Sequence, residues 1–501
     1  MHFFYKRYQQ FVVIVVLLVS LSACLVGPDF ERPQAPTRFN ESPWLQRTTG
    51  SFGTAGVSQY FVHTKHPIVF DWWRCFRSEK IDALVMLGLR HSPNLAKAEA
   101  VLKEAQETLN AKKGGWFPAF SAQLAAQRGT SLTTGSAATG SAAAATTSSV
   151  VNTALPTVSI FNLFNASVNV SYMLDFFGGL RREIESLQKQ VDYQYFQRGA
   201  AVLSLVGNIV TTTIAMASLE SQLAVTQQLV AEQKEQLMIL KQQLRLGGAS
   251  LSEVWTQQNQ VAQTQATLPP LEKSLAQTRH TLAVLVGDFP DAMTIPHMKL
   301  SELQLPSRLP LSVPSSLVRQ RPDVCAAEAL WAAANAQVGV ATARLYPQFT
   351  ITTSYGRLSS MSQHFFSPSN QLWNLGSALL QPLFSGGSLQ AQRRAAIAAY
   401  DQAKFQYQQV VLQAFENVAD TLRALQADAR ELKAQQQAES TAAANLNLTQ
   451  QQFRLGGVSY LALLEAQRQY QRSRIGLLQA QASRFVDTAA LFQALGGGVA
   501  T

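Results

Sequence analysis

Few side chains in this sequence have the type and the spacing that catalysis or metal binding requires. His63 and His66 form a weak pair in a predicted loop, and Cys75 and Cys325 stand far apart without the spacing of metal ligands. We find no Ser/His/Asp set, no phosphate-cradling glycine loop and no paired metal motif. The sequence therefore predicts a protein that is not an enzyme and that uses no cofactor or metal.

Cys24 is the one cysteine whose surroundings predict a modification. Two basic residues precede an apolar run from Phe11 to Leu21, which is the layout of a secretory signal peptide. The run ends in Leu21-Ser22-Ala23-Cys24, which resembles the lipobox of bacterial lipoproteins, where the cysteine is diacylated on sulfur and becomes the new N-terminus. We expect residues 1–23 to be a lipoprotein signal peptide and Cys24 to carry a lipid anchor. The alternative is an ordinary signal peptide followed by a chance cysteine.

The chain after Cys24 contains an internal duplication. Pro93 aligns with Pro322, and RLGGASL from Arg245 matches RLGGVSY from Arg454, with the order of motifs preserved. Each half therefore predicts a helix, paired strands, a very long helix, a glycine-marked turn and a returning helix.

The long helices have the spacing of a coiled coil. Val202, Ile209 and Met216 recur every seven residues, and no proline interrupts residues 180–246 or 389–455. At about 1.5 Å per residue, each segment can run unbroken for roughly 100 Å. Both end at Leu-Gly-Gly with a serine two residues later, where glycine can cap one helix and serine can begin the next. These turns are predicted tips of helical hairpins.

Four short segments are predicted strands: three alternate apolar and polar residues with the period of a β-strand, and the fourth, from Leu372 to Phe384, alternates less cleanly. Phe349, Ile351 and Tyr355 fall on one face of one such segment, opposite small polar residues. Membrane barrels need this pattern, with lipid outside and water inside, although a half-exposed soluble sheet is an alternative. Four strands cannot close a barrel in lipid, so the chain must oligomerise. Three copies give about twelve strands, which is wide enough for a lumen.

The segments that connect these strands are poor in large apolar residues. Gly129 to Thr157 is rich in Ser, Thr, Ala and Gly, and Ser359 to Asn370 joins the second pair. We expect both to be loops outside the cell. The formal charge of +10 is spread along the chain and gives no reason to expect a nucleic-acid partner.

With these features the chain resembles the TolC/OprM-type outer-membrane efflux proteins, and among them the lipoprotein branch often called the NodT family. The resemblance covers essentially the whole mature chain. The residues that carry it include Cys24-Leu-Val-Gly-Pro-Asp29, Trp72-Trp73, Pro93-Asn94-Leu95, Phe117-Pro118, Arg321-Pro322-Asp323 and Leu463-Leu464-Glu465-Ala466-Gln467.

The resemblance implies a mixed α and transmembrane β fold, with four strands per chain in a trimeric 12-strand barrel and a long helical coiled-coil tunnel in the periplasm. It also implies a homotrimer that contacts outer-membrane lipid and joins, through a periplasmic adaptor (membrane fusion) protein, an inner-membrane pump of the RND type. The expected segments after the signal peptide are a lipidated N-terminal segment on the equatorial region, the first repeat, an equatorial linker, the second repeat and a C-terminal tail, at 24–77, 78–287, 288–316, 317–496 and 497–501.

The same resemblance implies functional positions at the hairpin tips. The expected docking residues for adaptor hairpins are Arg245, Leu246, Gly247, Gly248, Ser250, Arg454, Leu455, Gly456, Gly457 and Ser459. Glu465 matches an acidic position that closes the periplasmic aperture in relatives, where three carboxylates would face one another and favour cations. Ala462 stands where some relatives carry a second acid, and Glu253 occupies the corresponding position in the first repeat. Simple helix caps and solvated surface carboxylates are the alternatives.

We therefore expect an outer-membrane exit duct for drugs or other small toxic compounds. It would conduct passively, because the sequence offers neither a nucleotide site nor a series of membrane-buried charges for proton coupling. A type I protein-secretion duct with the same fold is the first alternative, and the lipobox with its VGPD sequence favours efflux over it. A structural periplasmic coiled-coil lipoprotein is the second, and the alternating strands oppose it.

Overall fold

The structure is a computed structural model that describes residues 25–32, 59–64, 70–133, 157–290, 295–312 and 321–497. The expected signal peptide and Cys24 lie outside the described residues. Contacts divide the chain into two compact units. We call residues 1–30, 107–187 and 334–399 the strand unit, and residues 31–106, 188–333 and 400–501 the hairpin unit.

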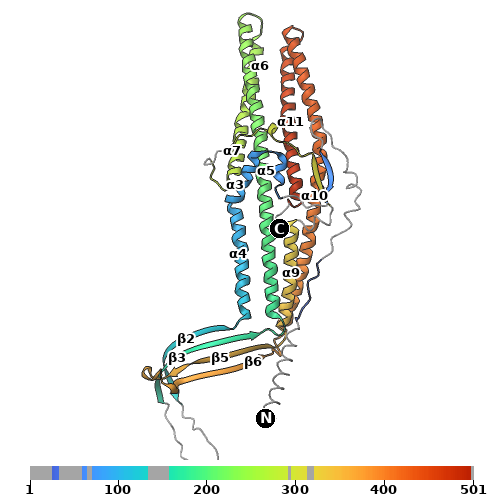
Figure 1. The fold of residues 1–501 in the computed structure, drawn as a ribbon. Helices are drawn as coiled ribbons and strands as arrows, with labels where there is room; N and C mark the ends of the chain where they lie inside the picture. Colours follow the sequence, from blue (N-terminus) through green and yellow to red (C-terminus); the bar gives the residue numbers. More distant parts are fainter. Residues whose placement is uncertain are drawn as a thin grey trace, which may run out of the picture. The chain divides into compact units, whose positions relative to one another are not determined.

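The strand unit is built on one antiparallel sheet in the order β2-β3-β5-β6, so the four predicted strands are confirmed (Figure 1). The strands are β2 Ala119–Thr133, β3 Thr157–Leu174, β5 Gln348–Ser359 and β6 Gln371–Leu380. The expected loop from Gly129 is wrong over its first residues, because β2 continues to Thr133 in register with β3. Backbone pairing sustains a strand there although the sequence is mostly Gly, Ser and Thr.

Alternate rows of this sheet differ sharply in polarity. Val168, Tyr355 and Trp373 pair across three strands and are 47%, 56% and 74% exposed. The neighbouring paired row carries polar side chains on the opposite face, namely Ser121, Asn169, Ser354 and Asn374. Directly paired residues share a face, so the sheet has one apolar and one polar surface. The strands β2 and β6 form its two edges.

Two helices of 67 residues dominate the chain, α5 Gly179–Arg245 and α10 Ser388–Arg454. One stretch of α5 is long and apolar enough to cross a membrane by composition, but half of it is buried inside the protein. Its heptad residues Ile209 and Met216 are fully buried, as expected for the core of a helix bundle.

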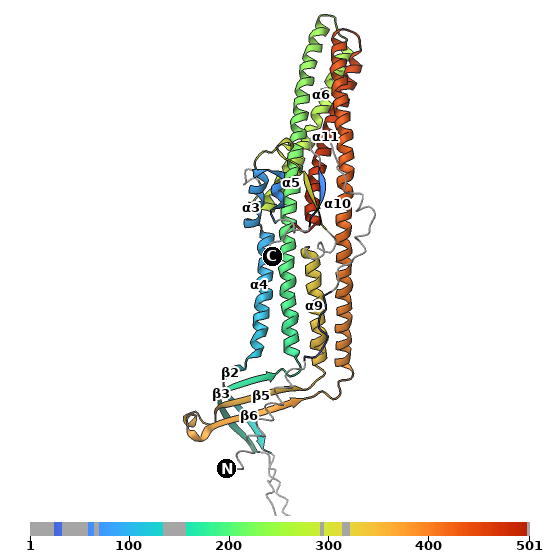
Figure 2. The same cartoon turned by 45° about the vertical axis from the view of Figure 1, so that its right-hand side comes forward.

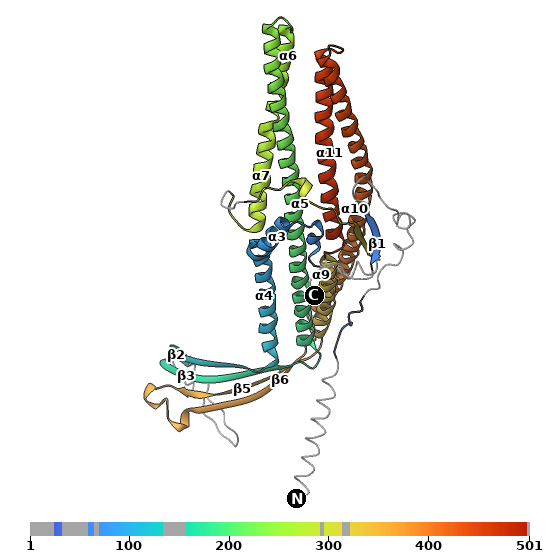
Figure 3. The same cartoon turned by 45° about the horizontal axis from the view of Figure 1, so that its top comes forward.

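The helices that return from the two tips differ. The second is continuous, α11 Tyr460–Ala494, whereas the first is divided into α6 Leu251–Ala266 and α7 Leu268–Val286. Pro269 and Pro270 stand in the first turn of α7, where their missing N–H groups are tolerated but cannot continue the hydrogen-bond ladder of α6. Figures 2 and 3 show α5 beside α6, and α10 beside α11, as two hairpins.

Shorter elements complete the two units. Helices α3 Glu79–His91, α4 Pro93–Lys113 and α9 Pro322–Ala343 precede the strands and long helices, and β1 Tyr60–Thr64 pairs in parallel with β4 Arg308–Ser312. The 3-10 helices are η2 Trp72–Phe76, η3 Gly114–Trp116, η4 Leu300–Glu302, η5 Ser362–His364 and η6 Pro368–Asn370. Within the hairpin unit, Trp72 stacks on Phe492 with ring centroids 5.5 Å apart, which fastens η2 to α11.

Candidate functional site

The first hairpin tip lies between α5 and α6. Gly247 has a φ of +79°, which glycine adopts without strain, and the N–H of Gly248 donates to the carbonyl of Gln243 at 2.8 Å. Ser250 then begins α6 by accepting from the N–H of Glu253. The turn leaves Arg245 exposed and Leu246 80% exposed, and the backbone cap itself requires no apolar side chain at position 246.

The second tip, between α10 and α11, repeats this geometry. Gly456 has a φ of +76°, and the N–H of Gly457 donates to the carbonyl of Gln452 at 2.8 Å. Ser459 accepts from the N–H of Ala462 and so caps α11. Arg454 is exposed and Leu455 is 87% exposed. The tips are therefore well-capped turns that each present an arginine and a leucine to solvent, and their role in docking stays a prediction.

The two predicted aperture carboxylates have different surroundings. Glu253 accepts from the backbone N–H of Ser250 at 2.7 Å and completes a capping box. Burial, and after it the negative charge of Glu253, raises the pKa of Tyr460 at the start of α11. Glu465 lies exposed in the second turn of α11. The Glu253 carboxylate is engaged in the cap of α6, whereas the Glu465 side chain is exposed to solvent. A role of either residue in the aperture stays a prediction.

The hairpins pack against each other just below the tips, in a contact that the sequence did not predict, although Leu463 and Leu464 belong to a motif quoted for the family resemblance. Leu240 and Val254 of the first hairpin form a buried cluster with Tyr460, Leu463 and Leu464 of the second. Neither the heptad pattern nor that motif indicates which hairpin covers which.

Amides extend this contact between the hairpins. The Tyr460 hydroxyl donates to Oε1 of Gln257, and Nε2 of Gln467 donates to Oε1 of Gln236 at 2.8 Å. Nε of Arg468 donates to Oε1 of Gln260 at 2.7 Å. Because Gln257 is fully buried, breaking its bond to Tyr460 would leave a buried amide without that partner.

A second unexpected site in the strand unit holds the residues directly after Cys24. Arg182 of α5 is 2% exposed and donates to the carbonyls of Val26 and Gly27 and, at 2.7 Å, to the carboxylate of Asp29. Gly27 has a φ of +108°, and a Cβ there would lie 2.5 Å from the Cα of Gly339. Only glycine fits this approach. We call Arg182 and residues 26–29 the N-terminal clamp.

The N-terminal clamp lies at the junction between β3 and α5. The N–H of Val26 donates to the carbonyl of Phe177 at 3.3 Å, and Nδ2 of Asn335 donates to the carbonyl of Pro28 at 2.8 Å. Leu25 lies against Gly178, where a Cβ would meet the Leu25 side chain at 2.4 Å. Leu25 thus contacts the chain on one side, although 40% of its surface is exposed.

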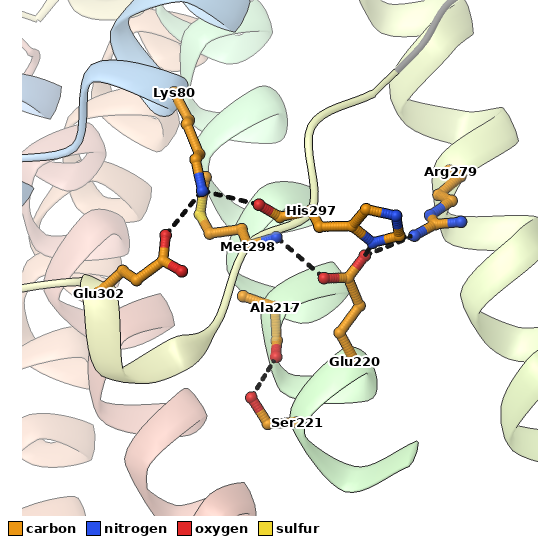
Figure 4. A network of polar contacts seen from close by, with 8 residues as sticks. All are labelled: Lys80, Ala217, Glu220, Ser221, Arg279, His297, Met298 and Glu302. Carbon is orange, nitrogen blue, oxygen red and sulfur yellow. Dashed lines mark hydrogen bonds and ion pairs between the residues drawn. The ribbon is translucent and has the colours of Figure 1, made fainter. Parts of the chain in front are cut away.

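A polar node in the hairpin unit ties the linker after α7 to the long helix α5 (Figure 4). Glu220 of α5 accepts from Nη2 of Arg279 at 2.6 Å and from the N–H of Met298 at 2.9 Å, and Nδ1 of His297 lies 3.2 Å from it. Lys80 of α3 donates to the carbonyl of His297 at 2.7 Å. We call this set the Glu220 node.

The strand unit also contains an apolar cavity of about 420 Å³ between the ends of α4, α5 and α9. Its walls include Phe176 and Leu180, and the ion pair between Lys112 and Glu183, 2.7 Å long, lies on its edge. Within the described ranges, no group of three His, Cys, Asp or Glu side chains is placed to hold a metal ion.

Comparison with known proteins places these features in context. The family model described as outer membrane efflux protein matches residues 84–288 and 313–497. The pyoverdine export outer membrane protein OpmQ of Pseudomonas putida is 31% identical over 433 residues, which are 85% of this chain and 88% of that protein. The probable outer membrane lipoprotein SilC of Salmonella typhimurium is 25% identical over 95% of this chain and 96% of its own length.

Solved structures show the same fold. The outer-membrane channel OprN superposes with a TM-score of 0.81 at 23% identity, and the match covers 95% of this chain and 99% of that one.

Proposed function

Because the chain belongs to the outer membrane efflux protein family, we propose that it is the outer-membrane exit duct of a tripartite efflux system, conducting drugs or other small toxic compounds. The main support for a duct is the four-stranded sheet, which has one apolar face, one polar face and two open edges. A periplasmic adaptor and an inner-membrane pump of the RND type supply cargo and energy, and the duct conducts passively.

The open edges support a closed trimer. The backbone groups of β2 and β6 need partners in lipid, and the same edges on two further copies supply them. Three copies of the four strands make a barrel of twelve, with the row of Val168, Tyr355 and Trp373 facing lipid and the row of Asn169 and Ser354 facing water. The long helices of the two repeats form the tunnel in the periplasm.

A lipid on Cys24 fits the N-terminal clamp. Cys24 precedes Leu25, which packs on Gly178 directly before α5, so acyl chains attached there would begin at the strand–helix junction. The relative SilC bears the name of a lipoprotein. The exposed Leu246 and Leu455 fit a docking role for the tips, because an apolar side chain that capping does not require is a natural contact for a partner helix. Glu465 and Glu253 would restrict the aperture between the tips.

Dye retention in cells tests this function. We expect a strain that lacks the gene to retain preloaded ethidium, and the wild-type chain to restore its loss when the cells are energised. The double variant Leu246→Ser with Leu455→Ser should reach the outer membrane as a trimer yet restore little. Equal restoration by this variant would contradict docking through the tips. If wild-type trimer in the outer membrane left ethidium retention unchanged, the efflux function would be contradicted.

A further inference from the structure

The two returning helices carry rows of residues at equivalent positions, and the row on α11 is buried whereas the row on α6 is exposed. Pairing Arg245 with Arg454 aligns Leu251 with Tyr460, Trp255 with Leu464 and Gln258 with Gln467. The three positions are spaced i, i+4 and i+7, so they follow one face of each helix. We call residues 251, 255 and 258 the α6 stripe and residues 460, 464 and 467 the α11 stripe.

The α11 stripe is buried within the chain. Its residues are 7%, 1% and 5% exposed. The first hairpin covers them, with Leu240 of α5 against the apolar pair and Gln236 of α5 bonded to the amide. This stripe is thus the surface by which the second hairpin packs on the first.

The α6 stripe is exposed. Leu251 is 48% exposed, Trp255 is 64% exposed and Gln258 is also exposed. A leucine and a tryptophan at successive turns, followed by an amide, form a surface of the kind that anchors protein interfaces.

The second hairpin offers a matching surface. The residue equivalent to Gln236 is Asn445 of α10, whose side chain is exposed, and Leu448 beside it is 54% exposed. In a closed ring of alternating hairpins, the contact from the second hairpin to the next first hairpin must repeat around the axis. The duplication supplies the amide half of that contact at the same relative position. The apolar half is supplied by Leu448, because the position of Leu240 is occupied by Thr449, which is buried.

We propose that the α6 stripe packs against α10 and α11 of the next copy of this chain, as the α11 stripe packs on the first hairpin within the chain. Trp255 fills the place of Leu464, and the amide of Gln258 meets Asn445 of the next copy as Gln467 meets Gln236. The proposal rests on the homotrimer of the proposed function and assigns the contact that closes the ring at the height of the tips.

Crosslinking between introduced cysteines tests the proposal in the full-length protein, with Cys75 and Cys325 replaced by serine. We expect Gln258→Cys combined with Asn445→Cys to give covalent dimers and trimers with a short bismaleimide. The matched pair Gln236→Cys with Gln467→Cys should give a crosslinked monomer only. Thr256→Cys with Asn445→Cys should give no dimer or trimer through residue 445, because residue 256 faces away from residue 258 on the helix.

The mass of the uncrosslinked protein separates the possible failures. A trimer in which the pair at 236 and 467 reacts, but the pair at 258 and 445 does not, would overturn the proposal and leave the duct intact. If the uncrosslinked protein is a monomer, both the proposed contact and the homotrimeric duct are contradicted. If Trp255→Cys in the trimer reacts with a bulky maleimide as fast as Leu246→Cys does, the stripe is open and faces another protein, which also overturns the proposal.

Discussion

Arg182 and Asp29 form an ion pair 2.7 Å long whose two ends differ in burial. The Arg182 side chain is 2% exposed, whereas that of Asp29 is 86% exposed. The contact joins the segment directly after Cys24 to the first turn of α5. Because the guanidinium also holds the carbonyls of Val26 and Gly27, it organises the clamp, and the carboxylate contributes one exposed bond.

We therefore predict unequal effects from removing the two partners. Arg182→Met removes several charge-assisted hydrogen bonds, each worth about 1.5–3 kcal/mol, and should speed hydrogen exchange of residues 26–30 by about tenfold to a hundredfold. Asp29→Asn removes a solvent-screened pair and should change it by less than about fivefold. Mass spectrometry of exchange in the solubilised protein measures both. Equal effects would show that the exposed carboxylate, and not the buried guanidinium, holds the segment.

At the tips, we predict that the two neighbouring glycines respond differently to alanine. Gly247→Ala places a side chain in the left-handed region at a cost of about 1 kcal/mol, so amides of the turn should exchange roughly fivefold faster. Gly248 lies outside that region, and a Cβ there would lie 3.7 Å from the Gln243 carbonyl, an ordinary contact. Gly248→Ala should leave exchange unchanged or slower. A reversed order would mean that the turn is not held by its backbone.

Local chemistry explains why the tips and strands could be predicted. Leu-Gly-Gly with a following serine determines a cap whichever neighbour is present, and the alternation around Ile351 marks a strand without knowledge of its partner. The end of β2 was misplaced because four of the five residues at 129–133 are Gly, Ser or Thr. Their strand depends on pairing with β3, which composition does not reveal.

The Glu220 node predicts a graded response in the linker. Glu220→Gln keeps an acceptor for the N–H of Met298 but loses the charge opposite the partly exposed Arg279, at about 1 kcal/mol. Glu220→Ala also leaves that N–H unpaired, at about 2–3 kcal/mol. Tryptic cleavage after Lys299 should be a few fold faster in Glu220→Gln and more than tenfold faster in Glu220→Ala.

The control for the node is Glu302→Gln, which removes the exposed pair with Lys80 and should change cleavage little. Cleavage in Glu220→Ala at the wild-type rate would show that β4 and the buried Leu300, rather than the node, hold the linker.

Asp428 of α10 predicts a pH dependence. Burial, followed by the charge of Asp487, raises the pKa of Asp428 to about 7. A carboxyl group whose pKa is higher in the folded protein binds its proton there first, so its stabilising contribution is present at low pH and lost as the pH rises towards 7. The Tm of the wild type should fall from pH 5 to pH 8 by more than that of Asp428→Asn. Identical falls would assign the dependence to other groups.

The N-terminal clamp and the Glu220 node could not be predicted from the sequence, for the same physical reason. Arg182 and Glu220 both belong to the long helix α5, where a charged side chain is ordinary, and the partners Asp29 and Arg279 stand 153 and 59 residues away. Their burial depends on how segments pack, whereas the sequence shows only local spacing. The burial of the α11 stripe could not be predicted either, because a heptad pattern marks apolar positions without indicating which helix covers them.

Single-channel conductance of the purified trimer in planar bilayers tests the central claim most directly. We predict stepwise conductance without nucleotide, and larger or more frequent steps for Glu465→Ala, because three facing carboxylates would no longer restrict the aperture. A Glu253→Ala control should have a smaller effect, because its carboxylate is engaged in the cap of α6. If Glu465→Ala conducts like the wild type, the duct is supported but the gating role of Glu465 is contradicted. A correctly folded trimer that never conducts would contradict the exit duct itself.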